Sequence, residues 1–297
     1  MLQHMDKNIL LRCEANCVSG FDFGCHYAND SAGKSSRLAF SDKKGIYLYQ
    51  GDAFSLMLSI LKKYPDGCFD MVFADPPYFL SNGGLSCQNG QEVSVNKGAW
   101  DKSAGLQADY NFHLLWLDLC QRLLKPDGTL WVSGTLHSIY SIGFAMQQLG
   151  YKLINDIVWQ KPNPPPNLAR RCFTHATETL IWAAKSKKSK YFFDYQKMRK
   201  INNDKQMQSV WIISPPLLEE KKYGKHPTQK PISLIKRCIE AASKPGDFIF
   251  DPFAGSATTG VAAANLGRKF CGIEMQQEFI GLAIKRLVDA TAKANWS

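Results

Sequence analysis

The chain has 297 residues, 45% of them hydrophobic, so it can bury the core of one large domain or of two smaller ones. Its 36 Lys and Arg residues outnumber its 26 Asp and Glu residues, and the resulting net charge of +10 favours a polyanionic partner such as nucleic acid. The 9 cysteines are scattered, and we find no apolar stretch of membrane-spanning length and no signal-like start. These features argue against a disulfide-stapled or membrane protein and predict a cytoplasmic one with free thiols.

The amino-terminal segment differs in composition from the rest of the chain. Residues 1–44 are polar and rich in Gly and Ser, and we predict that they form an extension to a catalytic domain over 45–297. The extension contains a small group of candidate metal ligands, Cys13, Cys17, Cys25 and His26. Their spacing matches no common zinc pattern, and adjacent Cys and His are awkward ligands, so we predict no metal site.

A first motif, Asp75-Pro76-Pro77-Tyr78, follows an apolar run over 69–74 that predicts an interior strand of a parallel sheet. The prolines fix their own φ and restrict the residue before them, so the chain should turn sharply and hold its carbonyl groups in fixed directions. An exocyclic amine such as adenine N6 is a poor nucleophile until acceptors bind its hydrogens. We predict that Asp75 and the Pro76 carbonyl are those acceptors, and that the Tyr78 ring supports a base extruded from its stack. The alternative is an ordinary proline turn.

The region between the two motifs predicts further elements. Residues 79–106 are rich in Gly, Ser and Asn, and we predict a structureless loop that acts as a mobile lid. We expect helices over 109–124 and 137–149, and strands over 128–133, 151–159 and 178–184, the last two as a hairpin at one sheet edge.

Residues 185–223 contain three basic runs, and we predict that they form an insertion that recognises DNA. The insertion carries four amides that could read adenine edges, on Asn202, Asn203, Gln206 and Gln208.

A second motif, Asp251-Pro252-Phe253-Ala254-Gly255-Ser256, lies between a strand over 246–250 and a helix over 258–266. Strand, tight loop and helix form a unit that cradles nucleotides. Another strand over 269–273 then ends at Glu274, about twenty positions beyond the glycine turn, where a ribose diol is commonly bound. Nicotinamide binding is the competing use, but the Gly-x-Gly-x-x-Gly pattern is missing.

Together these motifs resemble those of β-group DNA amino-methyltransferases, in which the Asp-Pro-Pro-Tyr motif precedes the Phe-x-Gly-x-Gly cofactor motif. The resemblance runs from about 46 to 287 and includes 47–53 and His226-Pro227-Thr228-Gln229-Lys230-Pro231. Within the group, 79–84, 172–179 and 205–207 are most similar to the second, single-strand-capable GATC adenine methylase of Dpn-type restriction systems. The family's second glycine is Ala257 here, which we expect to be tolerated if its φ is negative.

This resemblance implies an α/β fold of Rossmann-like type, with the two motifs in permuted order and a mostly parallel sheet covered by helices on both faces. It implies S-adenosylmethionine as cofactor. The residues implied to surround the cofactor are Asp52, Ala53, Asp75, His226, Thr228, Lys230, Asp251, Phe253, Gly255, Ser256, Thr258 and Glu274, and those implied in catalysis are Asp75, Pro76, Pro77 and Tyr78. We also expect Thr228 to cap a helix that has Pro231 in its first turn.

The activity implied is N6 methylation of adenine in GATC, within a restriction-modification system. The substrate would be double-stranded or single-stranded DNA, and two chains would pair through their catalytic domains. Cytosine N4 methylation stays open as an alternative, because its amine poses the same chemical problem. A catalytically silent DNA-binding relative is a further alternative, which the intact motifs disfavour.

Overall fold

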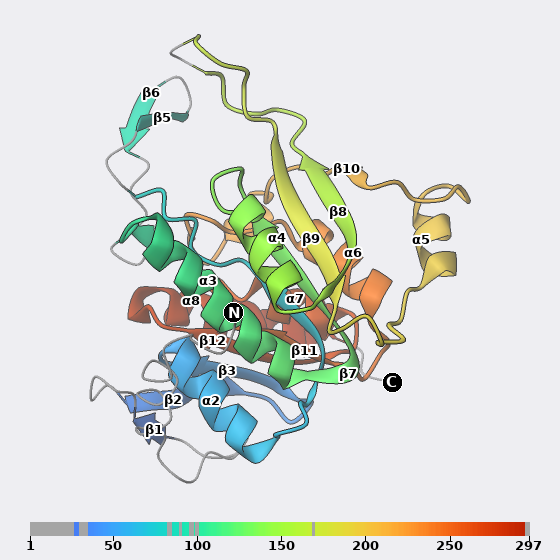
Figure 1. Cartoon of the computed structure of the whole chain (residues 1–297). Helices are drawn as coiled ribbons and strands as arrows, with labels where there is room; N and C mark the ends of the chain where they lie inside the picture. The colour runs from blue at the N-terminus through green and yellow to red at the C-terminus, as the bar shows by residue number, and fades with distance from the viewer. Residues whose placement is uncertain are drawn as a thin grey trace.

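The computed structural model describes residues 27–29, 35–81, 85–88, 91–94, 98, 101–167 and 170–294. Among these residues one ten-stranded sheet crosses the protein (Figure 1). Its strands, in order across the sheet, are β1 (Tyr27–Asn29), β2 (Ser35–Ser41), β3 (Ile46–Gln50), β12 (Lys269–Glu274), β11 (Phe248–Asp251), β4 (Phe69–Ala74), β7 (Leu124–Gly134), β9 (Thr177–Ala184), β8 (Lys152–Gln160) and β10 (Val210–Ile212).

The centre of this sheet is parallel. Strands β3, β12, β11, β4 and β7 all run in one direction, so their carboxyl ends meet at one edge of the sheet. Strands β9 and β8 then form the antiparallel hairpin that the sequence predicts. We expected this hairpin to form one edge of the sheet. It does not, because β10 pairs in parallel with β8 beyond it.

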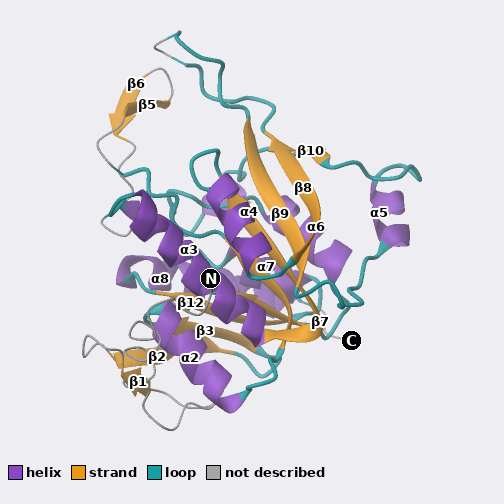
Figure 2. Ribbon diagram, in the orientation of Figure 1, coloured by secondary structure: helices purple, strands orange, loops and turns teal. Residues whose placement is uncertain are grey.

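Helices cover both faces of the sheet, as predicted (Figure 2). One face packs against α2 (Ala53–Lys63), α3 (Leu106–Leu123) and α4 (Ile139–Gln148). The opposite face packs against α6 (Ile232–Ala242), α7 (Thr258–Asn265) and α8 (Gln277–Lys293). The central strands are buried on both faces, which explains their continuous apolar runs. In the described part of the chain, no helix combines the length and the apolar character that crossing a membrane requires.

Part of the predicted amino-terminal extension belongs to the main sheet. Strand β2 lies within residues 1–44 but pairs antiparallel with β3, and β1 pairs with β2. A register shift between Leu38 and Phe40 lets these two side chains pack against different core clusters. Because of this shift the segment lacks simple alternation, so the sequence did not reveal the strand. The candidate ligands Cys13, Cys17, Cys25 and His26 lie outside the described residues.

The prediction of a structureless loop over 79–106 was wrong. Strands β5 (Leu85–Gln88) and β6 (Gln91–Ser94) form an antiparallel pair within it. Helix α3 also begins at Leu106, earlier than the expected start at 109. The lid motion remains a prediction.

The first basic run of the predicted insertion lies far from the carboxyl edge of the sheet. Because β9 is antiparallel to β7, the chain that follows β9 lies beside the amino end of β7. There Lys185 donates to the backbone carbonyl of Leu124, and the backbone N–H of Lys190 donates to Asp127. Helix α5 (Tyr195–Ile201) follows beside the carboxyl end of α6, where the backbone N–H of Asp194 donates to the carbonyl of Ala241.

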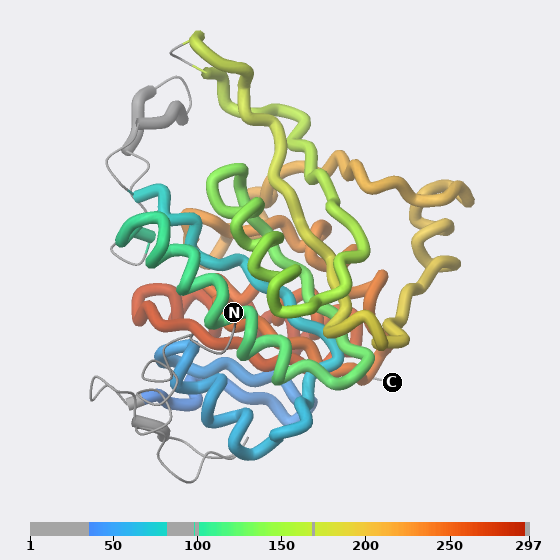
Figure 3. Tube along the Cα trace, in the orientation of Figure 1, coloured from blue at the N-terminus to red at the C-terminus, as the bar shows by residue number. Residues whose placement is uncertain are grey.

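The β8–β9 connection lies at the opposite edge of the sheet, where the central parallel strands end. The described residues 161–167 and 170–176, here called the arm, leave the sheet where β8 ends and extend well beyond the rest of the main sheet (Figure 3). Strand β8 is antiparallel to β9 and β9 is antiparallel to β7, so β8 ends at the same edge as β4 and β7. The arm therefore rises from the edge at which Asp75 lies.

Candidate active site

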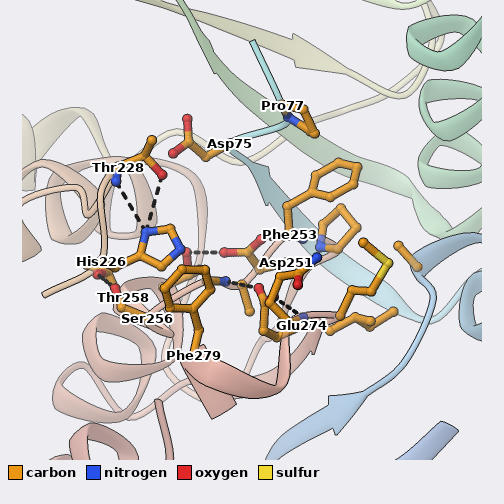
Figure 4. A pocket seen from close by; sticks show the side chains of 18 of the residues that line it. Asp75, Pro77, His226, Thr228, Asp251, Phe253, Ser256, Thr258, Glu274 and Phe279 are labelled. Atoms are coloured by element: carbon orange, nitrogen blue, oxygen red, sulfur yellow. Dashed lines mark hydrogen bonds between the residues drawn. The ribbon is translucent and has the colours of Figure 1, made fainter. Parts of the chain in front are cut away.

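A cavity of about 200 Å³, partly open to solvent, lies at the carboxyl ends of the central strands. Both sequence motifs reach it, because β4 delivers Asp75 and β11 delivers Asp251 to the same edge (Figure 4). The structure brings every predicted cofactor residue to the lining of this cavity: Asp52, Ala53, Asp75, His226, Thr228, Lys230, Asp251, Phe253, Gly255, Ser256, Thr258 and Glu274. These residues come from segments up to 222 positions apart, from Asp52 to Glu274, so the fold alone assembles them.

Asp251 ends β11 inside the cavity wall. One carboxylate oxygen accepts a hydrogen bond from the backbone N–H of Phe253 at 3.0 Å, and the other accepts the Thr259 hydroxyl at 2.6 Å. Burial raises the pKa of Asp251 to about 7, although these hydrogen bonds oppose the shift. A carboxyl in this environment is poised to take up a cationic group.

Gly255 allows the loop after β11 to pass close to neighbouring side chains. Its φ is +52°, and an added Cβ would lie 3.1 Å from the His226 ring. Its N–H donates to Glu274 at 2.8 Å, while the other Glu274 oxygen accepts from the Gln276 N–H at 2.6 Å. Burial raises the pKa of Glu274. The two backbone donors fix the carboxylate at the end of β12, facing the cavity.

Ala257 departs from our expectation. Its φ is +56°, in the left-handed region, and its side chain is fully buried at the start of α7. The condition of a negative φ is therefore not met, and the backbone here stores roughly 1 kcal/mol of strain relative to a glycine.

Arg286 of α8 forms hydrogen bonds to the loop that connects β11 to α7. Its guanidinium donates to the carbonyl and hydroxyl oxygens of Ser256 and to the hydroxyl of Thr258, at 2.6 to 2.9 Å. Burial lowers the pKa of Arg286 to about 10, so it remains charged at neutral pH. The sequence did not point to Arg286, because it lies on an ordinary amphipathic helix.

Two hydrogen bonds to the Asp75 carboxylate tie the Asp75-Pro76-Pro77-Tyr78 turn together. Asp75 accepts the Tyr78 hydroxyl on Oδ1 at 2.5 Å and the Lys230 ammonium on Oδ2 at 2.6 Å. Tyr78 is only 6% exposed, and Lys230 Nζ lies 5.3 Å from the centroid of its ring. The predicted open aromatic face is therefore not present in this arrangement. Burial, with Asp75 beside it, raises the pKa of Tyr78 well above its usual value, so the hydroxyl keeps its proton.

Thr228 does not cap a helix, contrary to our expectation. Its N–H and hydroxyl both lie 3.3 Å from Nδ1 of His226, and α6 begins later, with Pro231 at the N-cap position.

Three aromatic residues that the sequence did not reveal complete the cavity: Phe54, Phe112 and Phe279. The Phe54 and Phe112 rings meet edge to face at 5.5 Å, and Phe279 packs 4.1 Å from the His226 ring. Each lies on a helix with an apolar face, where the sequence alone cannot distinguish a cavity wall from core.

Comparisons with known proteins agree with this geometry. A DNA methylase family model of the N6/N4 type matches residues 69–285. Type II methyltransferase M2.LlaDCHI of Lactococcus lactis subsp. cremoris is 50% identical over 249 residues, which is 84% of this chain and 91% of that protein. Type II methyltransferase M2.DpnII of Streptococcus pneumoniae is 49% identical over the same shares.

Solved structures share the fold. M1.HpyAVI, solved as a complex with SAM, has a TM-score of 0.61 and 30% identity, and the match covers 81% of this chain and 98% of that one. The cytosine-N4-specific PvuII DNA methyltransferase has a TM-score of 0.63 at 20% identity, covering 86% and 94% of the two chains. With its own motifs at one cavity and close relatives along most of its length, this chain belongs to the N6/N4-type DNA methylase family.

Proposed function

We propose that this protein transfers the methyl group of S-adenosylmethionine to N6 of adenine in GATC, as the modification enzyme of a restriction-modification system. The observation that carries the proposal is that Asp75, an acceptor for an amine, lines the same cavity as Asp251 and Glu274. The relatives at 49–50% identity are type II methyltransferases, which supports modification of DNA at a defined sequence.

The residues present fit S-adenosylmethionine. Asp251 and Asp75 suit its cationic amino acid end, and Glu274 suits the ribose diol. Phe54, Phe112 and neighbouring Phe253 offer apolar walls for its adenine. When bound, the cofactor supplies an electrophilic methyl group on sulfur.

The protein's own contribution is positioning and electrostatics. Asp75 and the Pro76 carbonyl would accept hydrogen bonds from the target amine and direct its lone pair toward the methyl group. Positive charge develops on the nitrogen as the bond forms, and a carboxylate at 14% side-chain exposure stabilises it more than water would. Holding the amine in this orientation supplies much of the remaining rate gain.

The arm is the best candidate for contact with DNA. Arg170 and Arg171 are exposed, and Phe173 is 96% exposed between this pair and the start of β9. Guanidinium groups bind phosphates, and an exposed ring can stack on an unpaired base. We propose that both duplex and single-stranded DNA bind here, that the protein acts in the cytoplasm where this DNA lies, and that two chains form a dimer.

Nucleoside mass analysis tests the proposed reaction. Duplex and single-stranded oligonucleotides with one GATC, and scrambled controls, are incubated with the protein and S-adenosylmethionine and then digested. We expect N6-methyladenine only from the GATC oligonucleotides. N4-methylcytosine would replace the proposed target with the cytosine amine, and no methylated base on any DNA would overturn the proposal.

A further inference from the structure

Lys230 is shared between two carboxylates at the end of the cavity. Its ammonium lies 2.6 Å from Oδ2 of Asp75 and 3.5 Å from Oε2 of Glu178. All three side chains are largely buried, at 7%, 14% and 13% exposure for Lys230, Asp75 and Glu178. Burial acts to lower the pKa of Lys230, but Asp75, Tyr78 and Glu178 raise it well above its usual value, so it stays charged.

Both carboxylate oxygens of Asp75 already accept a hydrogen bond in this arrangement. Oδ1 accepts the Tyr78 hydroxyl, and Oδ2 accepts the Lys230 ammonium. An incoming amine therefore competes with these two donors for the carboxylate, and the charged ammonium is the stronger of the two competitors. Displacement of Lys230 would also move the ammonium away from the Tyr78 ring, and so would free both partners that the target base is expected to use.

Glu178 has an oxygen ready to receive that ammonium. Its Oε1 accepts a hydrogen bond from Lys161 at 2.5 Å, at the first residue of the arm. Its Oε2 is buried and has no hydrogen-bond partner among the described residues, although it faces Lys230. Burial acts to raise the pKa of Glu178, but Lys230 and Lys161 hold it below its usual value, so this oxygen is part of a carboxylate.

We propose that Glu178 is a positioning residue that takes the Lys230 ammonium from Asp75 when the target amine enters. The inference rests on the proposed function and adds to it a second position for Lys230. A buried ammonium must keep a carboxylate partner, because leaving it unpaired is strongly unfavourable. After the exchange Glu178 would bind both Lys161 and Lys230, while Asp75 would keep the Tyr78 hydroxyl and gain the amine as donors, so each buried charged group keeps a hydrogen-bonding partner.

The exchange also connects the active site to the arm. Lys161 is the first residue of the arm, directly after the last strand pair, Gln160 with Thr177, and Glu178 is the next residue of β9 after that pair. DNA bound along the arm could therefore shift Lys161, and with it the Glu178 carboxylate that receives Lys230.

The test is a double-mutant cycle on Glu178 and Lys230, measured as kcat on a GATC duplex, with the Kd of S-adenosylmethionine measured separately. In Glu178→Gln the receiving charge is lost and Lys230 stays on Asp75. We expect kcat to fall about tenfold or more while the cofactor Kd changes less than about twofold. In the Lys230→Met background, where Asp75 has no competitor, adding Glu178→Gln should lower kcat less than about threefold.

The matched control is Glu240→Gln. Glu240 pairs with Lys197 at 3.3 Å on the α5–α6 side of the protein, so the same chemical change should leave kcat unaltered. Thermal unfolding of each variant verifies that it is folded.

Fluorescence of 2-aminopurine at the target position provides a second readout, in which Glu178→Gln should extrude the base less than the wild type does. Full kcat in Glu178→Gln, or effects of the two substitutions that simply multiply, would overturn the inference while leaving the proposed function intact. A wild-type protein that neither methylates DNA nor extrudes a base would instead refute the proposed function, and this inference with it.

Discussion

Oδ1 of Asp101 lies 2.9 Å from the backbone nitrogen of Tyr78 and accepts its hydrogen bond. The same oxygen accepts from the Phe79 N–H at 2.9 Å, and Oδ2 accepts the Ser81 hydroxyl at 2.8 Å. Phe79 has a φ of +58°, so the chain leaves the Asp75-Pro76-Pro77-Tyr78 turn in a strained conformation that these bonds hold. Asp101, fully buried, therefore links the start of the predicted lid to a point near its end, next to the Asp75-Pro76-Pro77-Tyr78 turn.

We predict that Asp101→Ala lowers kcat about 100-fold, because a turn displaced by about 1 Å misplaces the acceptors for the amine. It should also reduce the free energy of unfolding by about 2 kcal/mol, since two buried N–H groups lose their partner. Asp101→Asn retains an acceptor oxygen and should recover most of kcat. Steady-state kinetics with urea unfolding checks this, and equal losses of kcat in both variants would contradict the positioning role.

Substitutions at two positions of the loop between β11 and α7 should have different effects, one on stability and the other on cofactor affinity. Ala257→Gly relieves a left-handed φ and should raise the free energy of unfolding by about 0.5–1 kcal/mol in urea titrations. Gly255→Ala adds a methyl group 3.1 Å from the His226 ring at a φ of +52°, so it should weaken cofactor binding about tenfold or more by calorimetry. A destabilised Ala257→Gly variant would show that the strain at this position is not real.

Much of the site, and less of its surroundings, could be predicted from the sequence. Motifs at strand ends identified Asp75 and Asp251, because a parallel sheet brings such ends to one edge whatever lies between them. Residues such as Phe112, Arg286 and Asp101 act through contacts between distant segments, and nothing in their local spacing distinguishes them from ordinary helix or loop residues. For the basic run after β9, the charge is visible in the sequence but the edge of the sheet at which it lies is not, so its contact with DNA stays a prediction.

The DNA surface can be located by comparing two charge deletions. Replacing Arg170 and Arg171 by Ala on the arm should weaken DNA binding and reduce the slope of log affinity against log salt by about 2. The same replacement of Lys187 and Lys188, beside the amino end of β7, should leave the slope almost unchanged. Anisotropy titrations over a range of salt concentrations measure both. The reverse result would place the DNA on the 185–223 side, as the sequence suggested.

The buried carboxyl of Asp251 should make stability depend on pH. Burial raises its pKa from 3.8 to about 7, so between these values the folded state binds more protons than the unfolded state, and stability falls as pH rises. The Asn side chain of Asp251→Asn does not titrate, so it adds no such dependence on pH. The free energy of unfolding of the variant minus that of the wild type should therefore grow from pH 4 to pH 7, by up to about 4 kcal/mol, and then level off. A constant difference across this range would contradict the shifted pKa.

The central claim is that Asp75 is the acceptor that activates the target amine. The most direct test measures single-turnover methylation of a GATC duplex by Asp75→Ala, together with the Kd of S-adenosylmethionine for the same variant. We predict that methylation is abolished while the cofactor Kd stays within about tenfold of the wild-type value, because the remaining cavity wall is intact. A variant that methylates DNA at the full rate would contradict the account.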